Sequence, residues 1–353
     1  MLQTSYHRMT DTAATTSSFE HLTALSARLR EANPPVVTSI GECMVEVVPL
    51  SASTAKLGYA GDTYNFAHYL RLLLKHRSAH IRFATALGTD FDSHQLRAAW
   101  EQRGIGTDYI MHDPERTVGL YVARNKPDGS KAYLFYRDTS AARRFFTLPT
   151  SPALIEKIVE ESTAIYSSAI TLAVLEHSQG RERLVDLYRC ARESGRVTIF
   201  DTNFRPRLWN NDTTEAELWL RKIIPFVDIL LPTDEDLSLI FEVTDTETLL
   251  ARCREYGALA VILKCGAKGC RIAEGSHSVI VPTTPLQHEL LDTTAAGDAF
   301  NAAIIAGLTQ GNSPLTAAHM ANRVAAVVLQ HPGALIPESA TTSLLRAFEA
   351  PSW

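Results

Sequence analysis

From about residue 152 onward, patterns of buried strands alternate with patterns of amphipathic helices. The expected strands span residues 164–168, 196–201, 227–231 and 259–264, and helices are expected over 176–193, 215–224, 234–241 and 246–256. Short apolar runs separated by helices are typical of parallel strands, in which each strand is joined to the next by a helix that crosses the sheet. The alternation therefore predicts an α/β fold with a central, mostly parallel sheet flanked by helices.

The first half of the chain adds strands to this sheet and predicts a second, smaller one. Strands are expected over residues 36–41 and at the start of 80–90, helices over 62–73 and 93–103, and one domain over 35–345. Two β-rich runs, 117–124 and 131–137, are joined by a Pro-Asp-Gly turn, which is typical of a hairpin. With residues 42–48 they predict a small antiparallel sheet, its strands drawn from about 42–59 and 117–146. Such a sheet cannot bury both faces, so we expect a lid over the main domain or a contact with a second subunit.

Composition excludes several classes of protein. The 353 residues are 45% hydrophobic and 21% charged, which suits one large core, and a net charge of −5 without a basic cluster argues against nucleic acid as a partner. No apolar run reaches the roughly 20 residues of a membrane span, and charged residues interrupt the first 30 residues, so we expect a cytoplasmic protein. The five scattered cysteines predict buried thiols rather than disulfides. Residues 1–34 are expected to be a flexible or docking extension, with a short helix over 19–31.

The sequence Asp-Thr-Thr-Ala-Ala-Gly-Asp at residues 292–298 ends an extended run and opens a helix expected to reach about residue 310. The first turn of a helix has unpaired N–H groups and the positive end of the helix dipole, which together attract anions. Ala295, Ala296 and Gly297 are small enough to let a phosphate approach, and Asp298 beside it could accept a proton from a hydroxyl. The pattern favours phosphoryl transfer. The alternative is an acidic residue that merely complements the dipole.

Other nucleotide-binding and hydrolase signatures are absent from the sequence. There is no GxxxxGK[ST] loop, no GxGxxG after a strand, no GxSxG and no HExxH. Arg205, which follows the expected strand 196–201, suits a substrate carboxylate because its planar guanidinium can bind both oxygens.

Residues 292–298 resemble the carboxy-terminal signature Asp-Thr-x-Gly-Ala-Gly-Asp of the ribokinase-like (phosphofructokinase-B-type) carbohydrate kinases, with Ala295 in place of the first glycine. The replacement requires an ordinary backbone conformation at residue 295. With the Gly119-Leu120-Tyr121 run, Tyr136-Arg137 and the segment around Arg205, residues 36 to 340 look like a 2-keto-3-deoxygluconate kinase. The resemblance implies a ribokinase-like fold and ATP-dependent phosphorylation of that sugar acid at its 6-hydroxyl, with Asp298 as the base and residues 295–298 as the anion hole.

The resemblance also implies the residues that contact each ligand. Those of the sugar acid are Gly61, Asp62, Asn65, Tyr121, Tyr136, Arg137, Ile170 and Arg205. Those of the nucleotide are Lys264, Gly266, Lys268, Gly269 and Asn322. In some relatives an arginine two residues after the lid tyrosine also contacts the substrate; Ala123 stands there in this chain, followed by Arg124. The family's Asn-x-x-Glu element, which acts through magnesium, corresponds to Thr233-Asp234-Glu235-Asp236, so Asp236 is the implied, indirect Mg²⁺ residue.

Alternatives remain for several of these residues and for the function. Asp62 could be a helix N-cap, Asn322 an exposed helical residue, and residues 233–236 a solvated acidic helix start. A kinase of a neutral ketose such as fructose, or of 2-keto-3-deoxygalactonate, is the alternative enzyme, and a sugar-sensing protein on the same fold is the alternative from another class. The expected partners are ATP with Mg²⁺, a small sugar acid, and a second copy of the chain through the lid sheet.

Overall fold

The computed structural model describes residues 19–125 and 131–351, and in these residues the main sheet has nine strands. Their order is β13-β12-β11-β10-β9-β8-β1-β4-β5. From β11 to β5 every neighbouring pair is parallel, whereas β12 and β13 are antiparallel to their neighbours. The predicted mostly parallel sheet is thus confirmed. The strands are β1 Val36–Ile40, β4 His80–Leu87, β5 Ile105–His112, β8 Ala164–Ser168, β9 Val197–Asp201, β10 Ile229–Leu230, β11 Ala260–Lys264, β12 Cys270–Glu274 and β13 His277–Val281.

Both faces of the sheet are apolar because successive residues of a strand point to opposite sides. Ile199 of β9 and Ile229 of β10 belong to one core cluster, and their neighbours Phe200 and Leu230 belong to the other. The helices that contribute to the first cluster are α1 Glu20–Glu31, α2 Asp62–Leu73, α3 Phe91–Gln102, α10 Ala296–Thr309, α11 Pro314–Val328 and α12 Thr341–Glu349. Those on the other face are α4 Ser151–Glu161, α5 Ala169–Val174, α6 His177–Glu193, α7 Thr213–Ile223, α8 Asp234–Phe241 and α9 Thr246–Glu255.

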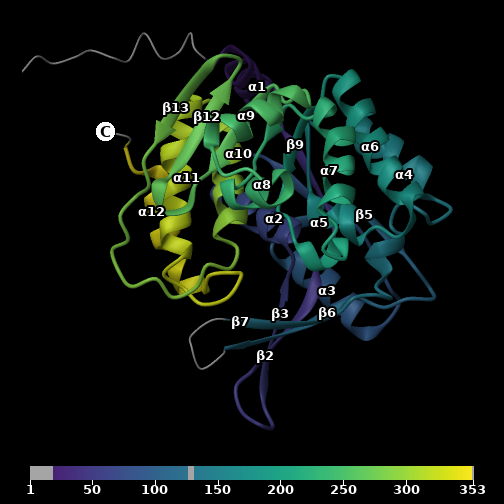
Figure 1. Cartoon of the computed structure of the whole chain (residues 1–353). Helices are drawn as coiled ribbons and strands as arrows, with labels where there is room; N and C mark the ends of the chain where they lie inside the picture. Colours follow the sequence, from purple (N-terminus) through teal and green to yellow (C-terminus); the bar gives the residue numbers. More distant parts are fainter. Residues whose placement is uncertain (1–18, 126–130, 352–353) are drawn as a thin grey trace, which may run out of the picture.

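The smaller sheet projects from one edge of the body (Figure 1). Its strands are β2 Met44–Pro49, β3 Ala55–Ala60, β6 Leu120–Asn125 and β7 Lys131–Tyr136, in the order β3-β2-β6-β7. The prediction of an antiparallel sheet is wrong at one place: β2 and β6 run parallel, because the connection between them passes through the main sheet and does not fold back as a hairpin. The turn at 126–130 lies outside the described residues.

The helix predicted near the N-terminus is present as α1 and docks on the body. Leu22, Leu25 and Leu29 are buried in the same core cluster as α10. The carboxylate of Glu274 accepts hydrogen bonds from the backbone N–H groups of His21 and Leu22, at 2.6 and 3.1 Å, and so satisfies donors of the first turn. The helix is therefore part of the hydrophobic core, whereas the boundary of the domain at residue 35 remains a prediction.

Some elements were not expected from the sequence. Strand β5 and helices α4 and α5 were not predicted, and β10 pairs over only two residues where five were predicted. No helix in the described ranges is long and apolar enough to cross a membrane. The five cysteines are free thiols, and Cys43, Cys253 and Cys270 are buried, as predicted.

Candidate active site

The first turn of α10 lies at the carboxyl end of the parallel strands, and no side chain caps it. The regular helical hydrogen bonds of α10 begin with the N–H of Ala299, which donates to the carbonyl oxygen of Ala295. In the described part of the chain the preceding N–H groups, those of Gly297 and Asp298, have no hydrogen-bond acceptor. Open N–H groups at the positive end of a helix form an anion site. The predicted start of the helix near residues 295–296 is confirmed.

Ala295 does not have the ordinary backbone conformation that the sequence predicted. Its φ is 61° and its ψ is 7°, in the left-handed region, where it forms the N-cap of α10. This region costs a residue with a Cβ about 1–2 kcal/mol, and glycine avoids that cost. The signature glycine that Ala295 replaces is thus suited to this backbone angle, and this chain tolerates the strain at the edge of its anion site.

We expect Ala295→Gly to raise the free energy of unfolding by up to about 1 kcal/mol, because relief of the left-handed strain exceeds the entropy that glycine adds to the unfolded chain. Ala99→Gly is the matched control. Ala99 lies inside α3 with ordinary helical geometry, so its replacement should lower the free energy of unfolding by about 1 kcal/mol. Chemical denaturation measures the free energy of unfolding of both variants. If Ala295→Gly lowered it as much as Ala99→Gly does, the assigned strain at residue 295 would be contradicted.

Asp298 is buried beside this anion site, with 7% of its surface exposed. Its Oδ2 accepts a hydrogen bond of 2.8 Å from Nδ2 of Asn65 in α2. Burial, and then the charge of Asp62, raise the pKa of Asp298 to about 8, while Asn65 opposes the shift. A carboxylate with a pKa near neutrality is a better base than an ordinary aspartate.

The N-cap and first turn of α2 bring Gly61, Asp62 and Asn65 close together, beside Asp298. Gly61 is the N-cap of α2, so Asp62 is not the cap, and its Oδ2 instead accepts hydrogen bonds from Ser168 and from Nδ2 of Asn203, the latter at 3.3 Å. Burial raises the pKa of Asp62 as well. A Cβ on Gly61 would lie 2.1 Å from the carbonyl oxygen of Glu42, so only glycine fits this close approach.

The lid and the neighbouring loops contribute the remaining predicted sugar contacts, and not all of them face inward. Tyr121 is buried on the inner face of the lid and donates a hydrogen bond of 2.6 Å to Oε1 of Glu46. Ile170, in α5, is half-buried two residues after Ser168. Tyr136 belongs to the outer face of the sheet, since it pairs with Leu120, and is 64% exposed. The structure therefore does not bring Tyr136 to the site.

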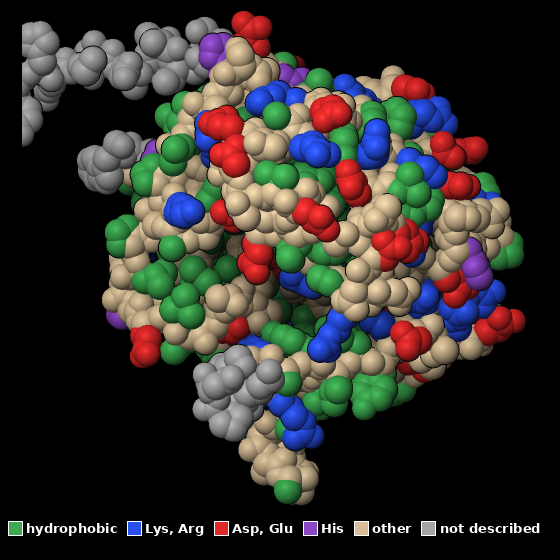
Figure 2. All heavy atoms as spheres, in the orientation of Figure 1, with side chains coloured by type: hydrophobic (Ala, Val, Ile, Leu, Met, Phe, Trp, Pro, Cys, Tyr) green, Lys and Arg blue, Asp and Glu red, His purple; other side chains and the backbone are tan. Residues whose placement is uncertain are grey.

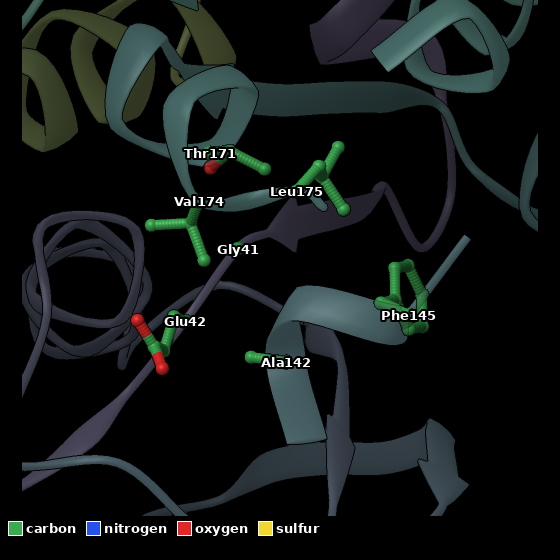
Figure 3. Close-up of a pocket in the computed structure, with 7 residues that line it drawn as sticks. All are labelled: Gly41, Glu42, Ala142, Phe145, Thr171, Val174 and Leu175. Atoms are coloured by element: carbon green, nitrogen blue, oxygen red, sulfur yellow. The ribbon is translucent and has the colours of Figure 1, made fainter. Parts of the chain in front are cut away.

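The two predicted arginines differ in their surroundings. Arg137 is buried and ion-paired with Glu42, which follows β1. Behind Glu42 lies a small cavity with room for about one water molecule, lined by Gly41, Glu42, Ala142, Phe145, Thr171, Val174 and Leu175 (Figure 3). It is too small for a sugar.

The second predicted arginine, Arg205, lies after β9. It is exposed and donates to the carbonyl oxygen of Phe204 at 3.2 Å.

Arg124 does not take the place of the arginine that Ala123 replaces. Arg124 pairs with Ala132 on the outer face of the lid, whereas Ala123 packs on the inner face near Met44 and Tyr121. The two neighbours point to opposite sides, as neighbours in a strand must.

The lid contacts the signature loop directly. Lys131, at the start of β7, forms an ion pair with the buried Asp292, and the hydroxyl of Tyr133 lies 3.1 Å from Oγ1 of Thr294. Asp292 also accepts from the backbone N–H of Gly333 at 2.6 Å. Burial alone would raise the pKa of Asp292, but the bonds from Lys131 and Thr294 outweigh it and lower the pKa.

The predicted nucleotide residues gather around the end of β11 and the end of β13. Gly266 and Gly269 have positive φ angles, 53° and 91°, and Lys268 between them is exposed. A Cβ on Gly269 would lie 2.2 Å from the carbonyl oxygen of Val281. Asn322 is buried, contrary to the exposed alternative, and its amide donates to the carbonyl oxygens of Val281 and Pro282 at 3.3 and 2.9 Å. It thus fixes the segment that closes against the glycine loop.

Asp236 lies in the first turn of α8, whose N-cap is Thr233. Asp236 is buried, unlike the solvated alternative, and accepts from Thr202 at 3.4 Å; burial and the charge of Asp201 raise its pKa, whereas Arg205 lowers it. In the described residues there is no group of three acidic, histidine or cysteine side chains that could hold a metal ion. Mg²⁺ usually keeps several waters and binds phosphates with one or two carboxylates, and a single Asp236 fits that indirect role.

Sequence reasoning missed a buried polar network beside Asp298. Lys264 was predicted only as a nucleotide contact, but its Nζ lies 3.0 Å from Oδ1 of Asp201 and 3.1 Å from Oδ1 of Asn301. Asn301 in turn donates to Oδ2 of Asp201 at 2.8 Å and to the hydroxyl of Tyr166 at 3.1 Å. One signal was available, since Asn301 follows Asp298 by three residues and so shares its face of α10.

The surface is hollowed between the body and the lid, and acidic and basic side chains line the hollow (Figure 2). A buried base beside an uncapped helix N-terminus, with a glycine loop and a lid around it, is an arrangement for transferring an anionic group to a hydroxyl.

Comparison with known proteins agrees with this geometry. Residues 35–341 match the model of the pfkB family of carbohydrate kinases. The chain belongs to this family. This pfkB kinase is 31% identical over 315 residues to the 2-dehydro-3-deoxygluconokinase of Haemophilus influenzae, covering 88% of this chain and 99% of that one. It is 32% identical to the enzyme of the same name from Dickeya dadantii, covering 85% and 96%. The PfkB protein of Polaromonas sp. JS666 shares its fold, with a TM-score of 0.73 at 23% identity over 88% of this chain and 99% of that one. These findings confirm the predicted ribokinase-like fold and the predicted phosphotransferase.

Proposed function

We propose that this pfkB kinase transfers the γ-phosphoryl group of ATP to the 6-hydroxyl of 2-keto-3-deoxygluconate. The observation that carries the proposal is Asp298, buried beside the open N–H groups of α10 with a pKa raised to about 8. The choice of substrate is supported by the two relatives named 2-dehydro-3-deoxygluconokinase, of which this chain covers nearly the whole length.

In the proposed reaction the sugar acid lies between the lid and the body, within reach of Gly61, Asn65 and Tyr121. Asp298 accepts the proton of the 6-hydroxyl, and the N–H groups of Gly297 and Asp298 stabilise the charge on the phosphoryl oxygens. The glycine loop at 266–269 holds the nucleotide. Mg²⁺, when bound with ATP near Asp236, would neutralise phosphate charge. The lid excludes water, which would otherwise compete as the acceptor.

An assay of ADP release over a panel of acceptors tests the substrate. 2-Keto-3-deoxygluconate is expected to give the highest kcat/KM, above 2-keto-3-deoxygalactonate, fructose and ribose. Equal turnover of neutral sugars would favour a ketose kinase, and a protein that binds sugars without releasing ADP would be a sensor.

Arg205→Ala should raise KM for the sugar acid by about 10- to 100-fold, because a hydrogen bond to a charged group contributes about 1.5–3 kcal/mol. KM for ATP should change by less than about 3-fold, since the proposed partner of Arg205 is the substrate carboxylate. Steady-state kinetics with each substrate varied in turn measure both constants. Arg207→Ala, an exposed arginine two residues along, is the control. A larger rise in KM for ATP than for the sugar acid would reject the role of Arg205.

We infer that the enzyme works in the cytoplasm, where ATP is available.

We also infer that two copies associate through the outer face of the lid. On that face Leu57, Leu134 and Tyr136 are 65%, 56% and 64% exposed, with Val47 and Val122 between them. A contiguous apolar face of a sheet is an interaction surface. The lid of a second copy presents the same apolar face, so the two faces can pack on each other about a two-fold axis. Sedimentation of a monomer alone at micromolar concentration would contradict the association.

A further inference from the structure

We propose that Lys264 is a second catalytic residue, whose ammonium contacts the transferring phosphoryl group, and that Asp201 and Asn301 are the positioning residues that hold it there. The inference rests on the proposed phosphoryl transfer but not on the identity of the sugar. The observation behind it is a buried lysine at the mouth of the anion site, with two of its protons bound by the protein.

Lys264 is the last residue of β11, so its side chain leaves the sheet at the carboxyl ends of the strands. The side chain is 9% exposed, and lysine is seldom so buried unless it is paired. Asp201 and Asn301 accept two of the three ammonium protons, at 3.0 and 3.1 Å. A lysine ammonium has three donors, and no third protein acceptor contacts Nζ within the described ranges.

Gly297 shows where the remaining donor can be used. A Cβ built on Gly297 would lie 3.9 Å from Nζ of Lys264, which is the nearest atom outside the two chain neighbours and the helix's own backbone. The ammonium is therefore adjacent to the same first turn whose N–H groups are open. Because residue 297 has no side chain, an oxygen of a phosphoryl group bound there can reach both the backbone and Nζ. The helix dipole of α10 and the charge of Lys264 then stabilise the same phosphoryl oxygens.

Asn301 is the part that ties the ammonium to the base. It lies one turn after Asp298 on α10 and is fully buried. Its amide nitrogen donates to Asp201 and Tyr166, which fixes its oxygen toward Lys264. The network thus sets the position of Nζ relative to α10 rather than relative to the sheet alone. The charge of Lys264 also lowers the pKa of Asp298, against the larger effects of burial and Asp62.

The step is balanced without any proton from Lys264. The bond between O6 of the acceptor and the γ-phosphorus forms as the bond from that phosphorus to the β,γ-bridging oxygen breaks. The hydroxyl proton goes to Asp298, and ADP leaves with the electron pair of the broken bond. Lys264 keeps its three protons and stabilises the charge on the phosphoryl oxygens throughout.

Lys264→Met tests the contact, with Lys75→Met, an exposed lysine after α2, as the matched control. We expect kcat to fall by about 10²- to 10³-fold, as for loss of one stabilising donor. Calorimetric titration with magnesium and either ADP or β,γ-imido-ATP is the second measurement. The affinity for β,γ-imido-ATP should fall by about 10-fold, equivalent to about 1.4 kcal/mol, while that for ADP changes less than about 2-fold. Lys75→Met should match the native protein in both.

A purely structural ion pair predicts a different result: both nucleotides would lose affinity equally, or kcat would stay within about 3-fold of native, and either outcome would overturn the proposal. If Lys264→Met does not fold, Lys264→Gln keeps a donor for Asp201 but loses the charge, and the same criteria apply. Asn301→Ala should lower the affinity for β,γ-imido-ATP relative to that for ADP, but by a smaller factor than Lys264→Met does. The reason is that this substitution misplaces the ammonium without removing it. The titrations use no sugar acid, so a native protein inactive on every acceptor would reject the substrate while leaving this test intact.

Discussion

Asp298→Asn is expected to lower kcat by about 10²- to 10⁴-fold, the usual contribution of a positioned general base. Asparagine has the shape of aspartate and can still accept the hydrogen bond from Asn65, but it cannot take the hydroxyl proton. The affinity for β,γ-imido-ATP should stay within about 3-fold of native, because the N–H groups of the first turn remain. Kinetics of ADP release and calorimetry measure the two quantities.

Asp245→Asn is the control for this substitution. Asp245 is the N-cap of α9, and asparagine caps a helix about as well, so turnover should be unchanged. Near-native turnover of Asp298→Asn would remove the assigned base and with it the proposed mechanism.

The raised pKa of Asp298 has a second consequence, for stability. Aspartate in the unfolded chain titrates near 3.8, whereas in the folded protein Asp298 titrates near 8. Between these values the folded state holds a proton that the unfolded state has released, so the free energy of unfolding falls as pH rises from about 4 to about 8. At about 1.4 kcal/mol per pKa unit, the loss from this residue is at most about 6 kcal/mol.

Asp298→Asn should therefore melt at a higher temperature than the native protein at pH 8, and the difference should shrink toward pH 4. Differential scanning calorimetry across this range without nucleotide is the measurement. Asp245→Asn should show no gain at pH 8, because the pKa of that exposed aspartate is lowered, not raised. A native protein whose stability rises between pH 5 and 8 in parallel with Asp298→Asn would contradict the assigned pKa.

The same pKa predicts the pH dependence of turnover. The value of kcat/KM should rise with pH toward a plateau above about 8, as the base loses its proton.

The sequence predicted the order of the elements well because the strands that matter are buried on both faces. The run 260–263, for example, is apolar throughout and follows the helix α9, so local pattern and tertiary environment agree. The strand β5 and the parallel pairing of β2 with β6 were missed, since pairing between distant segments leaves no local trace.

The residues of the site also divide into those that local motifs predicted and those that only the fold brings together. Asp298, Gly61 and Asn65 lie in short motifs at helix starts, where small residues and carboxylates are conspicuous, and the structure brings them together. Asp201 and Asn301 are 100 positions apart, and their contact depends on the order of strands in the sheet. The left-handed angle of Ala295 was missed for another reason, because alanine does not signal such a conformation.

The two contacts from β7 to the loop before α10 link the entrance to the chemistry. Any movement that lifts the hairpin far enough to admit a sugar must separate Lys131 from Asp292 and Tyr133 from Thr294. The loop that carries Ala295 then loses its counter-ion while the pocket is open to solvent. We therefore expect the state that admits water to be the one in which the anion site is least well supported, so that lifting of the lid disfavours hydrolysis of bound ATP.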